Sequence, residues 1–477
     1  MTEQPYCLSI DGRQVPGDAT FAVANPATGA VVAQAPDASQ AQLDQAVDAA
    51  SAAFAGWAAT PIEQRKALVS KLGDAIDANL DALKRVLTSE QGKPHADAEW
   101  EIGGAAGWCR ATATLDLPVT VNEDTPERYS VTRHVPVGVV GAIAPWNFPV
   151  ILAIWKVAPA LVAGNTVVLK PSPFTPLATL MIGEIAQSVL PPGVLNVLSG
   201  GDALGPWMSA HPGIAKIAFT GSTATGRKVM ASAAASLKRL TLELGGNDAA
   251  IVLPDVDLDK VVPELFWAAF RNTGQVCVAA KRLYIHDLIY DELARRLVDY
   301  AATVKMGDGS EQGVQLGPVQ NALQYDRVCD LIRSAHEAGL AFLTGGEPKE
   351  SSAGYFVPIT IIDNPPDDAR VVTEEAFGPV LPLLRFSDVD EVVRRANDTQ
   401  YGLGGSVWSG DPEKARILGE RLRCGTVWIN EAQHVSPFAA LAGHGQSGVG
   451  AENGVEGLLH YTNVQTISVR RSTDPAT

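Results

Sequence analysis

A single cysteine with basic residues behind it is the feature of this sequence that first suggests covalent chemistry. Cys277 stands in FRNTGQVCVAAKR, which runs from Phe270 to Arg282. A free thiol has a pKa of about 8.5, so a useful nucleophile needs a helix N-terminus or a positive neighbour. Lys281 and Arg282 follow closely in sequence, and Gly274 would let backbone N–H groups approach the sulfur. This stretch alone fits either a nucleophile or an inert buried thiol.

Glu243 and Asn147 are candidates for proton transfer and for binding an oxyanion. Glu243 interrupts the apolar run LTLELGGN. A buried carboxylate is costly unless it is paired or functional, so Glu243 is either a general base or a solvent-facing residue of an edge strand. Asn147 lies in Trp146-Asn147-Phe148-Pro149, after the strand-like VGVVGAIA. Its amide would hold an oxyanion, or the four residues are simply a turn in which Pro149 starts a helix.

Two motifs at strand ends indicate a site for a ligand above a sheet. Lys170 closes the strand-like NTVVLK before Pro171-Ser172-Pro173, and these prolines stiffen the turn that presents its ammonium. The alternative is a solvated strand end. In GSTATGRK, Arg227 and Lys228 occupy the places where a P-loop needs Lys and then Ser or Thr, which disfavours hydrolysis of ATP or GTP. This glycine-rich turn before a helix fits phosphate binding and a structural turn equally well.

Alternating strands and helices are expected to bring these residues to one edge of a parallel sheet. From Val137, the runs VGVVGAIA, NTVVLK, VLNVLSG and IAKIAFTG alternate with helical stretches such as PLATLMIGEIAQSV. This pattern predicts βαβ units and a parallel sheet. Ligands bind beyond the carboxyl ends of such strands. A second α/β series is expected from about residue 246.

The remaining segments are predicted to frame this body. The first 35 or so residues have the pattern of short strands. A helix is expected to start at a capping box, Thr60-Pro61-Ile62-Glu63, with Pro at its first position, and to continue through Leu87 until Gly92 ends it. Two alternating runs, LPVTVNEDTPERYSVTRHVP and YTNVQTISVRR, are expected to form paired arms that meet another subunit.

The composition describes a folded protein of two or three domains. The 477 residues are 46% hydrophobic and 19% charged, with 44 Gly and 31 Pro spread along the chain. A net charge of -16 argues against a nucleic-acid partner. No signal peptide and no long apolar run is visible, which predicts a cytoplasmic protein that does not span a membrane. Five separated cysteines fit reduced thiols, and the histidines show no metal-ligand spacing.

The motifs taken together resemble the aldehyde dehydrogenase superfamily, from about Pro26 to Thr466. Seven of them occur in the family's order: PWNFP, KPSP, FTGS, LELGGNDA, FRNTGQVC, EEAFGP and a degraded PFGG-like PFAALAGHGQSGVG. The resemblance implies an α/β fold with a Rossmann-like cofactor domain, a second α/β catalytic domain and a small β-arm oligomerisation element. The expected limits are 1–117 and 137–245 for the cofactor domain, 246–445 for the catalytic domain, and 118–136 and 458–477 for the arms.

The resemblance also implies the reaction and the residues that carry it out. Cys277 would attack an aldehyde to give a thiohemiacetal, whose oxyanion is held by the Asn147 side chain and the Cys277 N–H. Hydride passes to the nicotinamide, and Glu243 activates the water that hydrolyses the thioester. Residues expected to contact the cofactor are Ile143, Ala144, Trp146, Lys170, Ser172, Pro173, Phe219, Gly221, Ser222, Gly226, Leu244, Glu375 and Phe377. Those expected near the substrate are Phe148, Trp155, Arg271, Val276, Val278 and Phe438.

Three departures from the family pattern leave cofactor and substrate open. Pro173 replaces a Glu that many NAD-preferring members carry, so NAD is expected while NADP remains possible. PFGG has become Pro437-Phe438-Ala439-Ala440. Arg271 matches one of two arginines typical of succinic semialdehyde dehydrogenases, but the second position is Trp155. An apolar or aromatic aldehyde therefore fits better than a semialdehyde. The motifs also leave open a CoA-acylating enzyme and an inactive structural member of the family, and a homodimer or homotetramer is expected.

Overall fold

A mostly parallel eight-stranded sheet forms the first half of the molecule in the computed structural model, which describes residues 5–347 and 353–471. The strand order is β19-β11-β10-β7-β8-β9-β1-β2, and the neighbours from β11 to β9 run parallel. The expected βαβ pattern is confirmed. The strands are β1 (Leu8–Ile10), β2 (Arg13–Val15), β7 (Val139–Ile143), β8 (Thr166–Lys170), β9 (Leu195–Val197), β10 (Lys216–Thr220), β11 (Arg239–Glu243) and β19 (Gly448–Val449).

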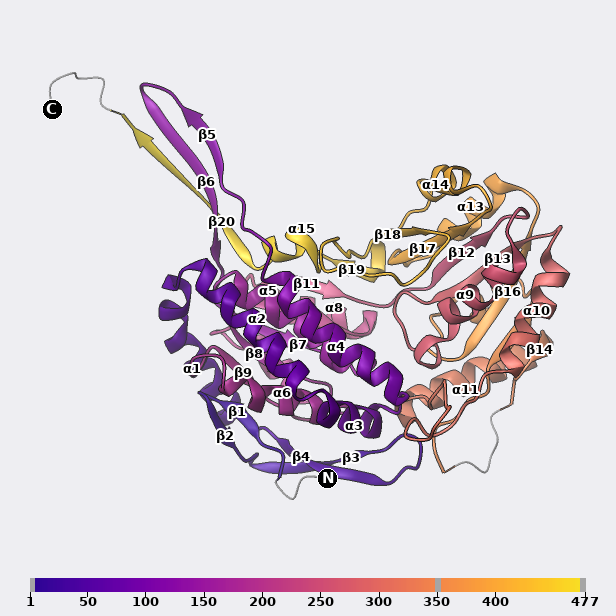
Figure 1. Cartoon of the computed structure of the whole chain (residues 1–477), viewed down its shortest axis with the longest axis horizontal. Coiled ribbons are helices and arrows are strands. Elements are labelled where there is room, and N and C mark those ends of the chain that lie inside the picture. Colours follow the sequence, from indigo (N-terminus) through magenta and orange to yellow (C-terminus); the bar gives the residue numbers. More distant parts are fainter. Residues whose placement is uncertain (1–4, 348–352, 472–477) are drawn as a thin grey trace.

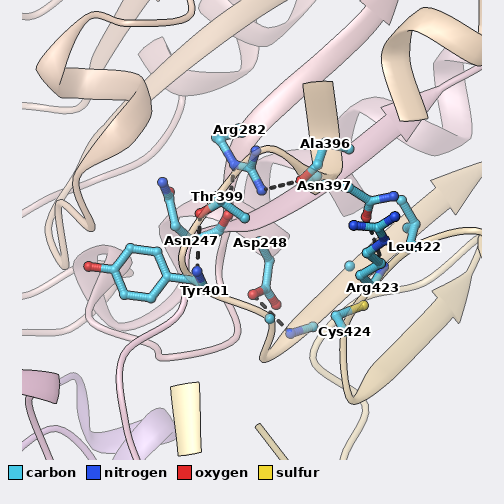
Figure 2. Close-up of a pocket in the computed structure, with 14 residues that line it drawn as sticks. Asn247, Asp248, Arg282, Ala396, Asn397, Thr399, Tyr401, Leu422, Arg423 and Cys424 are labelled. Carbon is cyan, nitrogen blue, oxygen red and sulfur yellow. Dashed lines mark hydrogen bonds between the residues drawn. The ribbon is translucent and has the colours of Figure 1, made fainter. Parts of the chain in front are cut away.

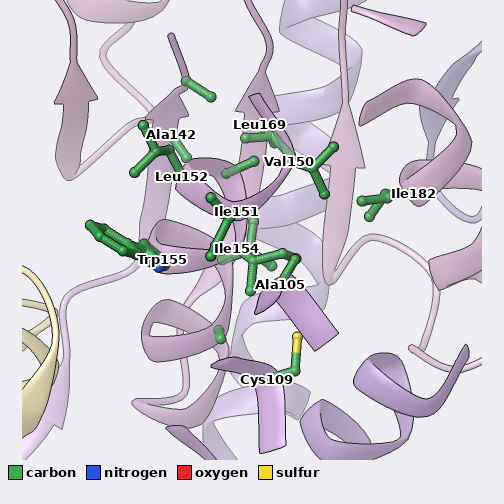
Figure 3. Close-up of a cluster of buried hydrophobic side chains, with 14 of the residues drawn as sticks. Ala105, Cys109, Ala142, Val150, Ile151, Leu152, Ile154, Trp155, Leu169 and Ile182 are labelled. Carbon is green, nitrogen blue, oxygen red and sulfur yellow. The ribbon is translucent and has the colours of Figure 1, made fainter. Parts of the chain in front are cut away.

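Helices cover both faces of this first sheet. One face carries α2 (Ile62–Ala78), α3 (Leu80–Gln91), α4 (His95–Thr112), α5 (Pro149–Val162) and α6 (Leu177–Gln187). The other carries α1 (Gln40–Ala59), α7 (Leu204–Ala210) and α8 (Thr223–Ala234). Figure 3 shows apolar side chains of α4, α5 and α6 meeting those of β7 and β8. Every residue of α5 is buried, so this helix crosses the core with its N-terminus at the carboxyl end of β7.

The helical region before the sheet differs from the prediction at its start. Pro61 is the N-cap of α2, and no side chain caps that helix, so the predicted capping box is wrong. The reason is that Thr60 ends the preceding helix α1, where its hydroxyl donates to the carbonyl oxygen of Gly56 at 2.9 Å. The expected single helix is also divided at Asn79. The stop is confirmed, because Gly92 has a left-handed φ of 92° at the end of α3.

The second half of the chain builds a separate seven-stranded sheet in the order β14-β15-β16-β13-β12-β17-β18, parallel except at β14. The predicted second α/β series is therefore confirmed. Its strands are β12 (Asp248–Val252), β13 (Ala280–His286), β14 (Ala341–Thr344), β15 (Thr360–Asp363), β16 (Val380–Phe386), β17 (Gly404–Trp408) and β18 (Thr426–Ile429). Its helices are α9 (Leu258–Phe270), α10 (Tyr290–Ala302), α11 (Ala322–Glu337), α12 (Arg370–Thr373), α13 (Val389–Asn397) and α14 (Pro412–Gly419).

A three-stranded arm projects from the body, as Figure 1 shows at the upper left. It consists of β5 (Thr120–Asp124), β6 (Arg128–Pro136) and β20 (Thr462–Arg470), with β6 in the middle. The prediction that the two alternating runs pair with each other is confirmed. The expected arm end at 472–477 lies outside the described residues, as do 1–4 and 348–352.

Two small elements complete the chain. The hairpin of β3 (Ala19–Ala24) and β4 (Val31–Asp37) forms a sheet of its own, and α15 (Gly454–Leu459) precedes the last strand. The helices between residues 5 and 471, leaving out 348–352, include none that is long and apolar enough to cross a bilayer.

Candidate active site

A cavity of about 110 Å³ lies at the carboxyl ends of β7, β10 and β11, where the first sheet faces the second half of the chain. This is the edge at which the parallel strands predicted a ligand site. The cavity collects these predicted site residues: Trp146, Asn147, Gly221, Ser222, Leu244, Cys277, Glu375 and Phe377. It is completed by Pro145, Thr220, Gly245, Gln324 and Arg327.

Asn147 is held rigidly in the turn between β7 and α5. It is 3% exposed, and Pro149 takes the first position of the helix as the sequence predicts. The Asn147 Nδ2 donates to the carbonyl oxygen of Gln275 at 3.0 Å, which ties it to the segment that carries the cysteine. Its own carbonyl accepts from Lys93 Nζ at 2.9 Å and from Asn272 Nδ2 at 3.0 Å. Within residues 5–347 and 353–471 the second hydrogen of the amide has no recorded acceptor, so it is left for a ligand.

Cys277 lies in the same cavity but in an unfavourable environment for a thiolate. Burial raises the pKa of its thiol, and the negative charges of Glu243, Glu375 and Asp248 raise it further. The neighbouring Lys281 does not offset this, because its ammonium donates to the carbonyl oxygens of Ala269 and Gly378 at 2.8 and 2.7 Å.

Arg282, the other basic residue behind the cysteine, is also turned away from the thiol. Its guanidinium donates to the carbonyl oxygens of Asn247 and Ala396, at 2.8 and 2.9 Å. The two cations that the sequence places beside Cys277 therefore bind backbone, and neither pairs with the sulfur.

Glu243 ends β11 and is one member of a buried charged cluster. It is 4% exposed, and its Oε1 has no hydrogen-bond partner among the described residues. Burial raises the pKa of its carboxyl well above the usual value, the charge of Glu452 raises it further, and Lys156 lowers it. Lys156 Nζ donates to Glu452 Oε1 at 2.5 Å and to Thr220 Oγ1 at 2.6 Å. The alternative of a solvent-facing edge residue is therefore wrong for Glu243.

The cofactor side of the cavity has groups that fit a dinucleotide. Ser222 caps α8, and its side chain accepts from the N–H of Thr225 at 3.2 Å. The other N–H groups of the first helical turn could donate to a phosphate. A Cβ on Gly226 would lie 2.5 Å from the Leu244 side chain, so this position has no room for one. On the opposite wall the Glu375 carboxylate accepts from the N–H of Gly246 at 3.0 Å.

The other predicted cofactor residues are not among those that line the cavity. Trp146 and Phe377, which do line it, meet edge to face with ring centres 5.3 Å apart. Phe219 lies under Gly221, where a Cβ would come within 2.6 Å of its ring. At the end of β8, Lys170 is 5% exposed and donates to the carbonyl oxygen of Pro171 at 3.1 Å. The remaining members are at the ends of β7 and β8: Ile143, Ala144, Ser172 and Pro173.

The predicted substrate residues divide into two groups. Trp155, Val276 and Val278 belong to the apolar cluster against which Phe148 and Cys277 pack. Trp155 also stacks on Trp108, with ring centres 5.4 Å apart.

Phe438 and Arg271 lie outside that cluster. Phe438 is 60% exposed. Arg271 is exposed, and its guanidinium carbon lies 5.9 Å from the centre of the Trp100 ring. Trp100 in turn meets Phe148 edge to face at 6.2 Å. The structure therefore places Arg271 on the surface, with the Trp100 ring between it and Phe148.

Sequence reasoning missed four charged or polar residues of this region. Lys156 is a lone lysine in the apolar run PVILAIWKVAPALV, the same kind of signal that identified Glu243. Glu452 gave no comparable signal. Gln324 and Arg327 come from α11, far along the chain, and only the folded arrangement brings them to the cavity.

A second, smaller cavity of about 20 Å³ lies in the other half of the chain (Figure 2), and Cys277 is not among the residues that line it. Asp248 points into it with one oxygen that accepts from the N–H of Gly404 at 3.0 Å, while its Oδ2 has no hydrogen-bond partner among the described residues. Burial raises the pKa of Asp248 to about 8. A cavity of this size holds about one water molecule, so it is too small for a substrate.

The fold and the site define an α/β protein of the dinucleotide-binding class with a cysteine in its central cavity. Residues 14–467 match the model of the aldehyde dehydrogenase family. A probable aldehyde dehydrogenase from Pseudomonas sp is 43% identical over 98% of this chain and 95% of that protein. A phenylacetaldehyde dehydrogenase from Pseudomonas fluorescens is 40% identical over 98% of this chain and 96% of that protein.

A solved structure agrees with these matches. The NAD+ complex of an aldehyde dehydrogenase from Bacillus cereus has a TM-score of 0.95 at 35% identity and covers 98% of this chain and 97% of that one. The chain belongs to the aldehyde dehydrogenase family. It is an NAD(P)-dependent oxidoreductase that oxidises an aldehyde to the carboxylic acid.

Proposed function

We propose that Cys277 is the nucleophile of this oxidation and that Asn147 binds the oxyanion it creates. The observation that carries the proposal is that both residues line one cavity while Asn147 is bonded to the segment leading to the cysteine. The Cys277 thiol first releases its proton to water. The thiolate sulfur then bonds to the aldehyde carbon, and the carbonyl oxygen becomes an oxyanion. The second N–H of the Asn147 amide and the backbone N–H of Cys277 stabilise that charge.

Glu243 is the base of the hydrolytic step. A bound nicotinamide cofactor would supply the hydride acceptor, and loss of hydride from the substrate carbon would leave a thioester on Cys277. The Glu243 carboxylate then takes a proton from a water molecule, whose oxygen attacks the thioester carbon. The carbon–sulfur bond breaks, and the carboxylic acid leaves. The raised pKa of Glu243 makes its carboxylate a stronger base than an exposed one, at the cost of a smaller ionised fraction near neutral pH.

The cofactor would be held from both walls of the cavity. Lys170 at the end of β8 would bind the adenosine ribose, the start of α8 around Ser222 would face the pyrophosphate, and Glu375 with Phe377 would hold the nicotinamide end. This assignment is supported by the spare donors of Lys170 and of the helix start.

The substrate is an apolar or aromatic aldehyde. Trp155, Val276 and Val278 supply a buried apolar surface next to Cys277, and Phe148 packs on it. The similarity to a phenylacetaldehyde dehydrogenase supports the same class. Arg271 speaks against a semialdehyde, because its guanidinium lies on the surface against Trp100.

The test separates the two chemical steps. Glu243→Gln should still release a pre-steady-state burst of NADH with a short aromatic aldehyde and then turn over at least about 100-fold more slowly, because only thioester hydrolysis is impaired. Cys277→Ser should abolish both phases, whereas the matched control Cys424→Ser, a half-buried cysteine of the second cavity, should keep both. A folded Glu243→Gln enzyme without a burst would contradict the role given to Glu243.

We further infer how the chain is divided and assembled. Residues 1–117 and 137–245 form the cofactor domain, and 246–445 the catalytic domain. The arms at 118–136 and 458–477 join subunits into a homodimer or homotetramer, which is supported by exposed apolar side chains on the arm, such as Val121 and Val464. A cytoplasmic location is in keeping with the reduced cysteines.

A further inference from the structure

The Lys170 ammonium is a buried cation with donors to spare. It sits at the carboxyl end of β8, is 5% exposed, and within the described part of the chain donates one hydrogen bond, to the carbonyl oxygen of Pro171. A lysine ammonium has three N–H donors, so two remain for a ligand. Pro173, three residues further on, has no side-chain acceptor that could share the ligand's hydroxyl groups.

Two carboxylates from other segments reach the same place. β9 runs parallel beside β8 with Val197 opposite Leu169, so the loop that follows β9 lies next to Lys170. That loop contains Asp202, which is exposed. Asp37 ends β4, and its Oδ1 accepts from the N–H of Gly201 in the same loop at 3.1 Å.

The charges of both residues act on the lysine. Burial lowers the pKa of Lys170 to about 8, and Asp202 and then Asp37 oppose that shift. One cation and two carboxylates leave this corner with a net charge of about -1 when all three are ionised.

We propose that Asp37 and Asp202 make this corner select NAD over NADP, in place of the carboxylate that Pro173 does not supply. The inference rests on the proposed function, in which Lys170 binds the adenosine ribose. In dinucleotide-binding folds a carboxylate near the ribose accepts hydrogen bonds from its hydroxyls, whereas NADP sites provide an arginine for the 2′-phosphate. A doubly charged phosphate next to two carboxylates is repelled, and the Lys170 ammonium alone does not neutralise it.

The experiment measures binding directly. Dissociation constants for NAD and NADP, and for the fragments 5′-AMP and 2′-AMP, are determined by calorimetry on the full chain and on Asp37→Asn, Asp202→Asn and the double variant. Each single change should lower the preference for NAD over NADP by about tenfold, and the double variant by more, because each removes one negative charge beside the 2′ position. The fragments should show the same trend.

Two controls define what counts as a result. Asp48→Asn removes an exposed carboxylate of α1 that does not act on Lys170, and it should leave the preference within twofold of wild type. Asp202→Glu keeps the charge and should keep the preference. If Asp37→Asn does not fold, Asp202→Asn alone decides, since Asp202 is exposed.

The outcomes separate this inference from the proposed function. An unchanged NAD-to-NADP ratio in a folded double variant that still binds NAD overturns the inference and leaves the proposed function standing. A wild-type protein that binds neither dinucleotide overturns both.

Discussion

Replacing Glu452 with Gln should make Glu243, the proposed hydrolytic base, ionise at lower pH. Glu452 lies beside Lys156 and contributes a negative charge that raises the pKa of Glu243. Two like charges about 6 Å apart at an effective dielectric constant of about 20 repel by about 3 kcal/mol. This corresponds to about 2 pKa units. Because the Lys156 ammonium partly neutralises the charge of Glu452, we expect a decrease of about 1 to 2 units in the pKa of Glu243.

The sign of the effect follows from which form of Glu243 is active. Water activation requires the carboxylate, so turnover limited by hydrolysis rises with pH through the raised pKa of Glu243. Loss of the Glu452 charge lowers that pKa, and the rising limb of kcat should move to lower pH. The Lys156 charge, which is then no longer neutralised by Glu452, acts in the same direction.

The assay is kcat as a function of pH, with the NADH burst used at each pH to show that hydrolysis stays rate-limiting. Glu456→Gln, four residues away on α15 and exposed, is the matched control and should leave the limb in place. Thermal unfolding checks that the buried Lys156, deprived of its counter-ion, has not unfolded the enzyme. A limb that stays where it is, or moves to higher pH, refutes the electrostatic coupling between Glu452 and Glu243.

Two further predictions concern buried carboxylates. Folding raises the pKa of Asp248 from 3.8 to about 8, because burial favours the neutral carboxyl. The folded state is therefore most stable below about pH 4, where Asp248 is neutral in both the folded and the unfolded chain. This contribution to stability is lost as the pH rises to about 8. Asp248→Asn should therefore match wild type in thermal unfolding near pH 4 and become more stable by up to a few kcal/mol at pH 8; parallel melting curves across this range would contradict it. Glu101 is fully buried, pairs with Lys93 Nζ at 2.6 Å and accepts the N–H of Val150 at 2.8 Å. Glu101→Gln should lower the free energy of unfolding in urea by about 3–5 kcal/mol, and adding Lys93→Met should restore part of it; a double variant no more stable than the single one would argue against an uncompensated Lys93 charge.

The sequence predicted the elements whose signals are local. The parallel strands that end at Lys170 and Thr220 are short apolar runs between helical stretches, and the structure confirms both runs as strands. A buried Glu243 was one of the two alternatives that the sequence offered, because a carboxylate in an apolar run followed by two glycines is costly to bury unless it is paired or functional. These predictions needed only residue type and spacing.

What escaped prediction depends on contacts between distant segments or on competition between neighbours. Lys156 and Glu452 are 296 residues apart and pair only because α5 and the end of the chain meet beside β11. The capping box failed for a different reason: Thr60 had the right residue type, but the preceding helix had already used its hydroxyl. Sequence patterns do not show which of two adjacent helices a residue serves.

The basic residues behind Cys277 show how a correct motif can have a different physical role from the one its charges suggest. The turn before the cysteine contains Asn272 and Thr273 with φ of 51° and 60°, which is strained for residues other than glycine and especially for a β-branched one. Such a turn persists only where its surroundings fix it. Thr273 Oγ1 donates to Gly317, and Asn272 Nδ2 to Asn147, at 2.8 and 3.0 Å.

Lys281 belongs to the same support. Its ammonium donates to the carbonyl oxygens of Ala269 and Gly378, and a Cβ at Gly274 would lie 2.5 Å from its Nζ. The cation is therefore used to hold the backbone that aims Cys277, and the thiol gains no stabilisation from it. Because burial opposes the thiolate as well, the free enzyme should keep Cys277 protonated at neutral pH. Under the proposed mechanism its reactivity then depends on the position in which the turn holds it, and on Asn147, the proposed oxyanion donor, which is bonded to that turn.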